Sequence, residues 1–304
     1  MAPTYTPDAI QAQRRYLLSR HPDIVTADEF ADALGVKEGS EQLNELSKLN
    51  LIREYVGRNS QEPPEKQDPP LSEFCAAYLP KLVQMFIDPP PVKVPGMDAD
   101  RRQDMRLHNA YLDMLVAVQH VPYFIHYFRS DKPTAEPGKR LPIVLADRIV
   151  SVAQPWHEWI LHPTDDFSRP QYQETLADAI QLLGTLVTIF RKKDLLPDGT
   201  KDALLPWLKK WANMFNGNLL GTVSSRLVQI FKDPEFRLEM KGMRSMLKNW
   251  NTCEYPGCHK KEDLKTCSRC RTVVYCSPEH QKEHWKYSGK RGLPHKALCF
   301  KTAY

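Results

Sequence analysis

Apolar residues recur every three or four positions along most of the chain before residue 250, which is the spacing of one buried face of an α-helix. Alternating apolar and polar residues bounded by hairpin turns, the pattern of a β-strand, are absent from this sequence region. One such helical stripe consists of Leu176, Ile180, Leu183, Val187 and Phe190. The pattern predicts helices at residues 71–87, 98–119, 121–130, 141–161, 170–192, 201–215, 218–231 and 234–249.

Shorter helices are expected before residue 57. Asp8 can cap a helix that continues through Arg20, and Thr26 with Glu29 has the spacing of a capping box. Ser40 is expected to cap a further helix. The apolar positions of that helix are Leu43, Leu46, Leu49 and Ile52.

Changes in composition divide the chain into four parts. Residues 57–70 are polar, rich in proline and poor in large apolar side chains, which is typical of a linker. We therefore expect a small helical N-terminal region at 1–56, this linker, an all-helical domain at 71–250 and a separate module at 251–304. The helical domain is either a bundle or a helical-repeat stack, and no fixed sequence period selects between the two.

Length and composition are those of a soluble globular protein. The chain has 304 residues, 41% of them hydrophobic and 26% charged, which is enough for a sizeable core and a second small module. No apolar run reaches the roughly 20 residues of a membrane span, and the first residues lack the apolar core of a secretory signal. We therefore expect no membrane segment and a location in the nucleus or cytoplasm.

Six of the seven cysteines lie in the last 52 residues, where they form four close pairs with two histidines. A structural zinc ion takes four Cys or His ligands in a tetrahedron, so eight ligands predict two zinc ions. The seventh cysteine, Cys75, lies in an apolar helix and is expected to be a small buried side chain. The pairs are Cys253 and Cys258, Cys267 and Cys270, Cys276 and His280, and His295 and Cys299.

Residues 251–304 are expected to depend on metal for their fold. They contain few large apolar side chains, so burial alone does not offset an ordering cost of about 1.5 kcal/mol per residue. A structural zinc ion contributes about 10–16 kcal/mol near neutral pH. A disulfide framework is the alternative, but a chain with a single cysteine in its first 250 residues and no secretory signal is typical of a reducing compartment.

The order of the cysteine pairs, the run Val273–Ser277, Gln281, Trp285 and the ending His295–Cys299 resemble a MYND-type zinc finger over about a sixth of the chain. The resemblance implies a cross-braced fold with two structural zinc ions. On the spacing alone, sequential pairing of the ligands is equally compatible. By the resemblance, the first zinc is held by Cys253, Cys258, Cys276 and His280, and the second by Cys267, Cys270, His295 and Cys299.

The segment departs from the family pattern in two loops. The first cysteine pair encloses four residues where two are usual, and residues 286–294 form a longer stretch than usual. Longer loops cost little free energy. Two further histidines are rival ligands: His259 is adjacent to Cys258, and His284 follows His280 by one helical turn. The spacing from Cys276 favours His280.

A short helix is predicted after Ser277, with Ser277 as its N-cap, Pro278 in its first turn and an acid near its positive end. This helix places Gln281 and Trp285 on one face. In peptide-binding members of the resembled family, the matching Gln and Trp line a groove for proline-containing ligands. The alternative is that Trp285 is a core residue between the two zinc sites.

The expected function is that of a non-catalytic adaptor. The helical domain is a platform, and the MYND-like finger docks proline-containing segments of partner proteins. The resemblance implies a role in transcriptional regulation. A methyltransferase of the SET/MYND type is an alternative, but the upstream region is helical and lacks an Asn-His pair before a cysteine-containing segment.

A DNA-binding regulator is the second alternative, and the charge distribution disfavours it. Residues 251–304 carry eleven Lys and Arg against five Asp and Glu, a formal charge of +6. Six thiolates and two Zn²⁺ ions reduce this charge to about +4. The segment also lacks the long recognition helix of a two-Cys two-His finger, so no concentrated basic stripe is available for phosphates.

Overall fold

The computed structural model describes residues 24–41, 43–90, 105–163, 168–190, 195–232, 242, 251–289 and 292–304. This part of the chain is mainly α-helical, and its sheet is a two-stranded one at the C-terminal end. The predicted fold class is therefore confirmed. The helices before residue 250 are α2 (Ala27–Leu34), α3 (Glu45–Asn59), α4 (Pro64–Ile87), α6 (Ala110–Val118), α7 (Pro122–Arg129), η1 (Pro133–Ala135), α8 (Glu136–Leu161), α9 (Ser168–Ile189), α10 (Asp198–Met214) and α11 (Leu219–Lys232).

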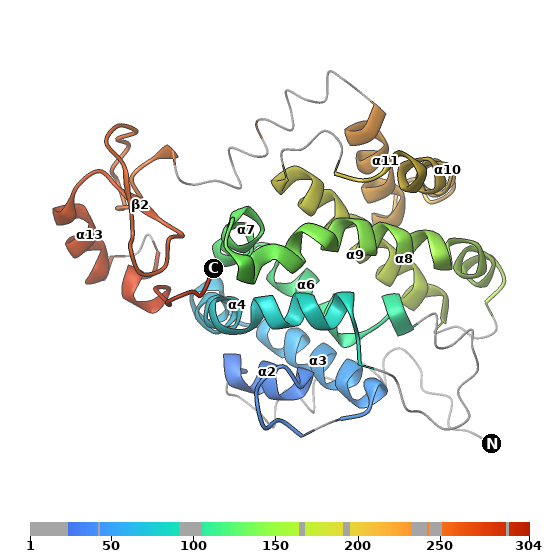
Figure 1. Ribbon diagram of the computed structural model, residues 1–304, viewed down its shortest axis with the longest axis horizontal. Helices are drawn as coiled ribbons and strands as arrows, with labels where there is room; N and C mark the ends of the chain where they lie inside the picture. Colours follow the sequence, from blue (N-terminus) through green and yellow to red (C-terminus); the bar gives the residue numbers. More distant parts are fainter. Residues whose placement is uncertain are drawn as a thin grey trace.

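The helices pack in successive layers. Helices α2 and α3 lie at one side, α4 and α6 come next, α8 and α9 follow, and α10 and α11 cover the far side (Figure 1). One continuous hydrophobic core runs from α2 to α11. The described part of the N-terminal region, from residue 24 to 56, therefore belongs to the same packed body as the helices that follow it. None of the described helices combines the length and apolar character required to cross a membrane.

The N-terminal cap predictions have mixed outcomes. The capping box of α2 is confirmed, because Thr26 Oγ1 accepts from the Glu29 N–H at 3.3 Å and Glu29 Oε2 accepts from the Thr26 N–H at 2.7 Å. The prediction that a helix starts after Ser40 is wrong. Helix α3 begins at Glu45, because Asn44 caps it, and in this register Leu46 is 63% exposed. The helices predicted at Asp8–Arg20 and 234–249 lie outside the described residues.

The linker predicted at 57–70 is wrong for most of its length. Helix α3 continues to Asn59, and α4 begins at Pro64 and includes Pro69 and Pro70. Proline is favoured in the first turn of a helix, since its missing N–H has no intrahelical partner there. Later prolines forfeit backbone bonds, and the burial of one helix face offsets this loss. The buried face of α4 begins with Leu71, Phe74 and Cys75.

Most other predicted helices are confirmed within a few residues, and the one at 98–119 is shorter where it is described. Helix α6 begins only at Ala110, because Asn109 interrupts the preceding turn. The Asn109 side chain accepts from the Leu112 N–H at 3.0 Å and donates to the carbonyls of Met105 and Arg106. A single capping residue therefore sets the start of this helix.

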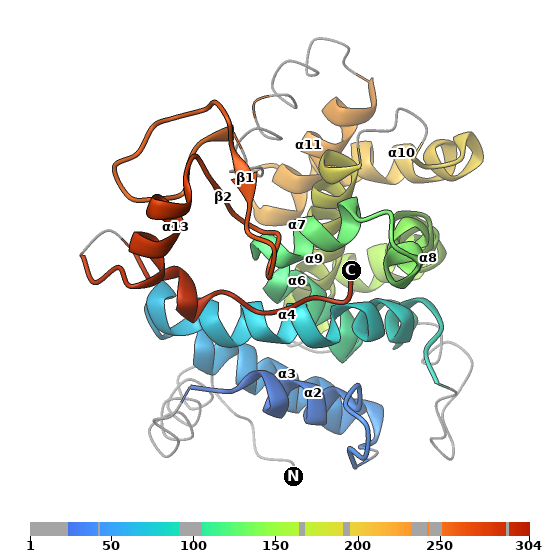
Figure 2. The same ribbon diagram turned by 60° about the vertical axis from the view of Figure 1, so that its left-hand side comes forward.

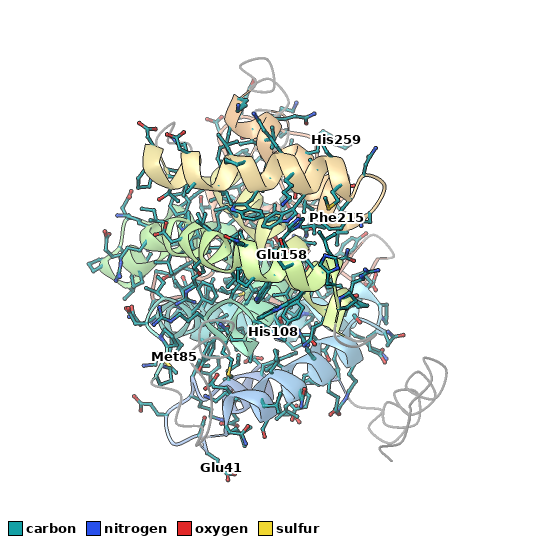
Figure 3. All side chains as sticks on the ribbon, turned by 90° about the vertical axis from the view of Figure 1, so that its right-hand side faces the viewer. Glu41, Met85, His108, Glu158, Phe215 and His259 are labelled. Carbon is teal, nitrogen blue, oxygen red and sulfur yellow. The ribbon has the colours of Figure 1, made fainter. Side chains whose placement is uncertain are left out.

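A half-buried polar cluster joins α3, α6 and α9. Arg53 Nε donates to Asp113 Oδ2 at 2.7 Å, and Arg53 Nη2 lies 2.7 Å from His108 Nε2, which also lies 3.0 Å from Gln171 Nε2. His108 lies among the helical layers in Figure 3. Burial, followed by the nearby positive charge of Arg53, lowers the pKa of His108 to about 4. The histidine is therefore neutral in the folded protein at pH 7.

The carboxyl of Asp178 on α9 is destabilised in its charged form. Burial, together with the negative charges of Asp113 and Glu174, raises the pKa of Asp178 to about 6. Between the ordinary carboxyl pKa and this value, the folded protein binds a proton that the unfolded chain does not bind. The free energy of unfolding therefore decreases as pH rises through this window, and the full cost is present at pH 7.5.

We expect Asp178→Asn to stabilise the protein at pH 7.5 by about 1–2 kcal/mol, because the amide of similar shape carries no charge. The gain should shrink as pH falls towards 5. Urea unfolding followed by far-UV circular dichroism measures both values. Glu158→Gln, at an exposed position (Figure 3), is the matched control and should change little. A destabilised Asp178→Asn at pH 7.5 would show that attraction to Arg53 outweighs the burial cost.

Candidate metal centre

Eight side chains of the C-terminal module converge in two groups of four. Within each group the ligand atoms all lie within 4.8 Å of one another. The two groups alternate along the chain, so the cross-braced arrangement is confirmed and sequential pairing is excluded. The first group is Cys253, Cys258, Cys276 and His280, and the second is Cys267, Cys270, His295 and Cys299.

The distances in the first group fit a tetrahedral zinc ion. Zinc–sulfur bonds of about 2.3 Å and zinc–nitrogen bonds of about 2.0 Å place two sulfurs about 3.8 Å apart and a sulfur and a nitrogen about 3.5 Å apart. The Sγ atoms of Cys258 and Cys276 are 3.8 Å apart. His280 Nδ1 lies 3.5 Å from Cys253 Sγ and 3.2 Å from Cys276 Sγ. The first group can therefore hold zinc through three thiolates and one imidazole.

The second group has the same donor set. The Sγ atoms of Cys267 and Cys299 are 3.9 Å apart, and His295 Nε2 lies 3.4 Å from Cys267 Sγ and 3.7 Å from Cys270 Sγ. A disulfide requires sulfurs about 2.05 Å apart, and all of these cysteines are free. The site is buried, with Cys270 and His295 almost fully covered. Both groups therefore fit structural zinc, and the two predicted zinc ions are supported by the geometry.

A tight turn between Cys253 and Cys258 accommodates the two additional residues of the first pair. The Cys258 N–H donates to the Tyr255 carbonyl at 2.9 Å, with Pro256 and Gly257 at the centre of the turn. Gly257 has a φ of +87°, the value that a type II turn requires at this position and that glycine adopts without strain. The backbone N–H of Lys260 donates to the Cys258 thiolate and lowers the pKa of this thiol.

The second ligand pair follows the first strand of a short hairpin. Strands β1 (Lys265–Thr266) and β2 (Val274–Tyr275) are antiparallel. The Cys267 N–H donates to the Val273 carbonyl and so extends the hydrogen bonding of the two strands. The Arg271 N–H donates to the Cys267 carbonyl at 2.9 Å and closes a turn around Cys270. The hydroxyl of Thr272 donates to Cys270 Sγ at 3.2 Å. The hairpin therefore directs Cys267 and Cys270 to the same metal.

Helix α13 (Pro278–Trp285) supplies His280, as predicted. The Ser277 hydroxyl accepts from the His280 N–H at 3.3 Å. A backbone N–H at this helix start and the Ser277 side chain lower the pKa of Glu279. The ring of Tyr255 stacks on His280 with centroids 4.6 Å apart and fixes the imidazole orientation. Helix α13 and the turn that carries Tyr255 together orient the His280 side chain.

The two rival histidines are not ligands in this arrangement. His284 is buried, and its Nδ1 lies 3.0 Å from the Tyr275 hydroxyl, outside both groups of four. Burial lowers the pKa of His284. His259 is exposed beside Cys258 and also lies outside the groups. His280 is therefore the histidine that completes the first group, as its spacing from Cys276 favours.

Gln281 and Trp285, the predicted partner-binding residues, lie four positions apart on α13, and both are half-buried. The indole of Trp285 meets the ring of His295 edge-on, with centroids 5.8 Å apart. Trp285 thus contacts a ligand of the second site while part of its surface stays open to solvent. Both interpretations of this residue, core and groove, are compatible with its position.

The segment after Cys299 attaches the module to the helical body. In Figure 2 it runs along α4. The hydroxyl of Tyr304 donates to the Cys75 carbonyl at 2.9 Å, and its ring meets Tyr127 edge-on at 5.0 Å. The hydroxyl of Tyr123 accepts from the Phe300 N–H at 2.7 Å. Tyr304 is fully buried, so this contact positions the second zinc site against the body.

The residues that attach the module to the helical body were not predicted from the sequence. Tyr304 contacts a position 229 residues earlier in the chain, and no local pattern reports such a contact. The turn at Tyr255 was open to prediction, because Pro-Gly is a turn dipeptide and an x4 spacing requires a turn. Its aromatic stack on His280 depends on where the fold places the pair Cys276 and His280, and it carries no sequence signature.

Comparison with known proteins identifies residues 253–299 as a MYND finger, a zinc-binding protein-interaction module. The chain is also similar to Egl nine homolog 1 of Homo sapiens, with 45% identity over 42 residues. That alignment covers 14% of this chain and only 8% of the human protein. No solved structure matches the chain. The predicted resemblance is confirmed for the C-terminal module.

Zinc removal is expected to unfold the finger, because its two metal sites supply most of the free energy that orders it. Native mass spectrometry should find two zinc ions per chain, and about one after Cys267→Ala. Cys75→Ala is the control, since Cys75 is buried in α4 and outside both sites, and it should retain two. A strong chelator should abolish the near-UV circular dichroism of residues 251–304. An unchanged near-UV spectrum after complete zinc loss contradicts this account.

Replacing Tyr304 is expected to loosen the finger from the body without removing zinc. Tyr304→Phe loses one buried hydrogen bond and should cost about 1 kcal/mol, whereas Tyr304→Ala also leaves a cavity and should cost about 3–5 kcal/mol. Chemical unfolding and zinc content measured together test this order. Equal stability of the alanine variant and the unsubstituted protein would show that the buried tyrosine does not hold the two parts together.

Proposed function

We propose that this protein is a non-catalytic adaptor, whose MYND finger docks short proline-containing segments of partner proteins beside a helical platform. The finger is a protein-interaction module by family, and the proposal adds the ligand class and the docking face. The observation that carries it is the pair Gln281 and Trp285 on α13, with Trp285 half-buried over the second zinc site.

The zinc sites support a structural role for the metal. Each site has four protein donors in a compact group, which fills the tetrahedral coordination of zinc and leaves no position for a substrate. In this proposal the ions do no chemistry. They fix the hairpin, α13 and the segment around His295 in one arrangement and so preorganise the docking face.

The geometry of α13 suits an extended proline-containing ligand. A polyproline segment is already ordered, so it loses little entropy on docking, and it presents ring faces that pack on an aromatic wall. Trp285 supplies such a wall, and the Gln281 amide four positions earlier can hydrogen-bond the ligand backbone. The contact between Trp285 and His295 holds the indole in place before the ligand arrives.

The cellular setting is part of the same proposal. Reduced thiols at zinc spacing favour the nucleus or cytoplasm. Recruitment of a partner in transcriptional regulation is the role that the resemblance to MYND fingers suggests. The helical body would then act as the platform that the finger connects to its partner.

We expect the zinc-loaded full chain to bind proline-containing peptides with micromolar affinity and Trp285→Ala to weaken this binding by at least about tenfold, since aromatic anchors dominate such interfaces. Gln281→Ala should weaken it less. Isothermal titration against a peptide panel measures both effects, after each variant is shown to retain two zinc ions.

Lys282→Ala is the matched control, because Lys282 is an exposed residue on the same helix. It should bind as the unsubstituted protein does. Absence of peptide binding by the zinc-loaded chain contradicts the proposed ligand class. Unchanged binding in Trp285→Ala would instead place the ligand away from the Gln281–Trp285 face.

A further inference from the structure

A cleft of about 620 Å³ lies at the junction of the finger and the helical body. Its body wall comes from the first turns of α4 and from residues 120–123. Its finger wall includes the turn after Cys253 and the residues Gly292, Leu293, His295 and Leu298. Figure 2 shows the start of α4 beneath the finger. The volume lies within the range of ligand-binding sites.

With the lining histidines His120, His284 and His295 neutral, the formal charges around the cleft have one sign. Glu65 and Asp68 reach it from α4, and Glu254 reaches it from the finger. None of the described residues that line it is a lysine or arginine. The finger segment as a whole carries eleven Lys and Arg against five acids, so the cleft is a local acidic site beside a basic module.

The three carboxylates do not form a close metal-binding group in the described part of the chain. In the described part of the chain, the close groups of three or more possible metal ligands are the two zinc sites, and these carboxylates belong to neither. Asp68 Oδ1 lies 3.9 Å from His120 Nε2 at the body wall. Separated carboxylates can each accept from a different N–H of a guanidinium or ammonium group.

The other walls suit the carbon stem of such a group. Val121, Val273, Leu293 and Leu298 also line the cleft. Lysine and arginine place their methylene stems on apolar surface while the charged end reaches polar partners. A small inorganic cation would leave these apolar walls without a contact, whereas a basic side chain in a peptide uses both parts of the site.

We propose that this cleft binds a lysine or arginine side chain carried by an apolar stretch of a partner polypeptide. The site is separate from the Gln281–Trp285 face and draws its selectivity from charge. The cleft exists only when the finger is docked on the body, because each part supplies one wall. The proposal rests on the finger being a protein-interaction module, and not on the proline-containing ligand proposed above.

The test uses the zinc-loaded full chain and two fluorescein-labelled pools of hexapeptides. Each pool has random apolar residues around a fixed central position, which is Lys or Arg in one pool and Glu in the other. Fluorescence anisotropy should show saturable binding of the basic pool, weakened by added salt, and no binding of the acidic pool. Asp68→Asn and Glu254→Gln should each weaken binding by about 5- to 10-fold.

The controls separate this site from other effects. Asp68 lies in α4 and outside both zinc sites, so its replacement tests the cleft without touching a residue next to a ligand. Glu41→Gln removes an exposed acid at the edge of the body (Figure 3) and should leave binding unchanged. Gln281→Ala should also leave it unchanged, whereas it weakens the proline-containing ligand.

Equal binding of the two pools, no binding of the basic pool, or unaltered affinity in Asp68→Asn with two zinc ions retained would overturn the proposal. Failure of the proline-peptide test with normal binding of the basic pool would remove only the proposed adaptor ligand. Different measurements therefore test the proline-containing ligand and the basic side chain in the cleft.

Discussion

Tetrahedral coordination by three thiolates and one imidazole, repeated twice, is the constraint on which the C-terminal module depends. The first group connects the turn at Cys253–Cys258 to the start of α13. The second group connects Cys267 and Cys270, between strands β1 and β2, to His295 and Cys299. Because the groups alternate along the chain, neither connection can be released without loosening the other. A module with a two-stranded sheet of two residues per strand has no other source of comparable order.

Zinc coordination also affects how the finger is attached to the helical body. Cys299 is a zinc ligand, and the next residues carry Phe300 and Tyr304 to Tyr123 and α4. Zinc in the second site therefore fixes the start of the segment that ends in Tyr304, whose ring is buried in the body. The result is a finger held at a defined position on a stack of helices, with the Gln281–Trp285 face on one element and an acidic cleft at the junction.

The sequence predicted the parts that depend on local chemistry. Ligand identity, helix capping at Thr26 and Ser277, and the stripe of α9 all follow from residue type and spacing within one or two turns. The predictions failed where tertiary burial overrides composition, as in α4, where Leu71 and Phe74 hold a proline-containing segment in a helix. Contacts such as Tyr304 with Cys75 could not be predicted, since they depend on how separate elements meet.

Both metal sites bring together three sulfurs and one nitrogen, which is the donor set of a closed zinc centre. X-ray absorption at the zinc edge of the two-zinc protein measures this donor set directly. We expect an average shell of three sulfurs at about 2.3 Å and one nitrogen at about 2.0–2.1 Å for each zinc. A shell with four sulfurs, with two nitrogens, or with an oxygen from water would contradict it, since each of these would require a ligand set other than the two groups of four.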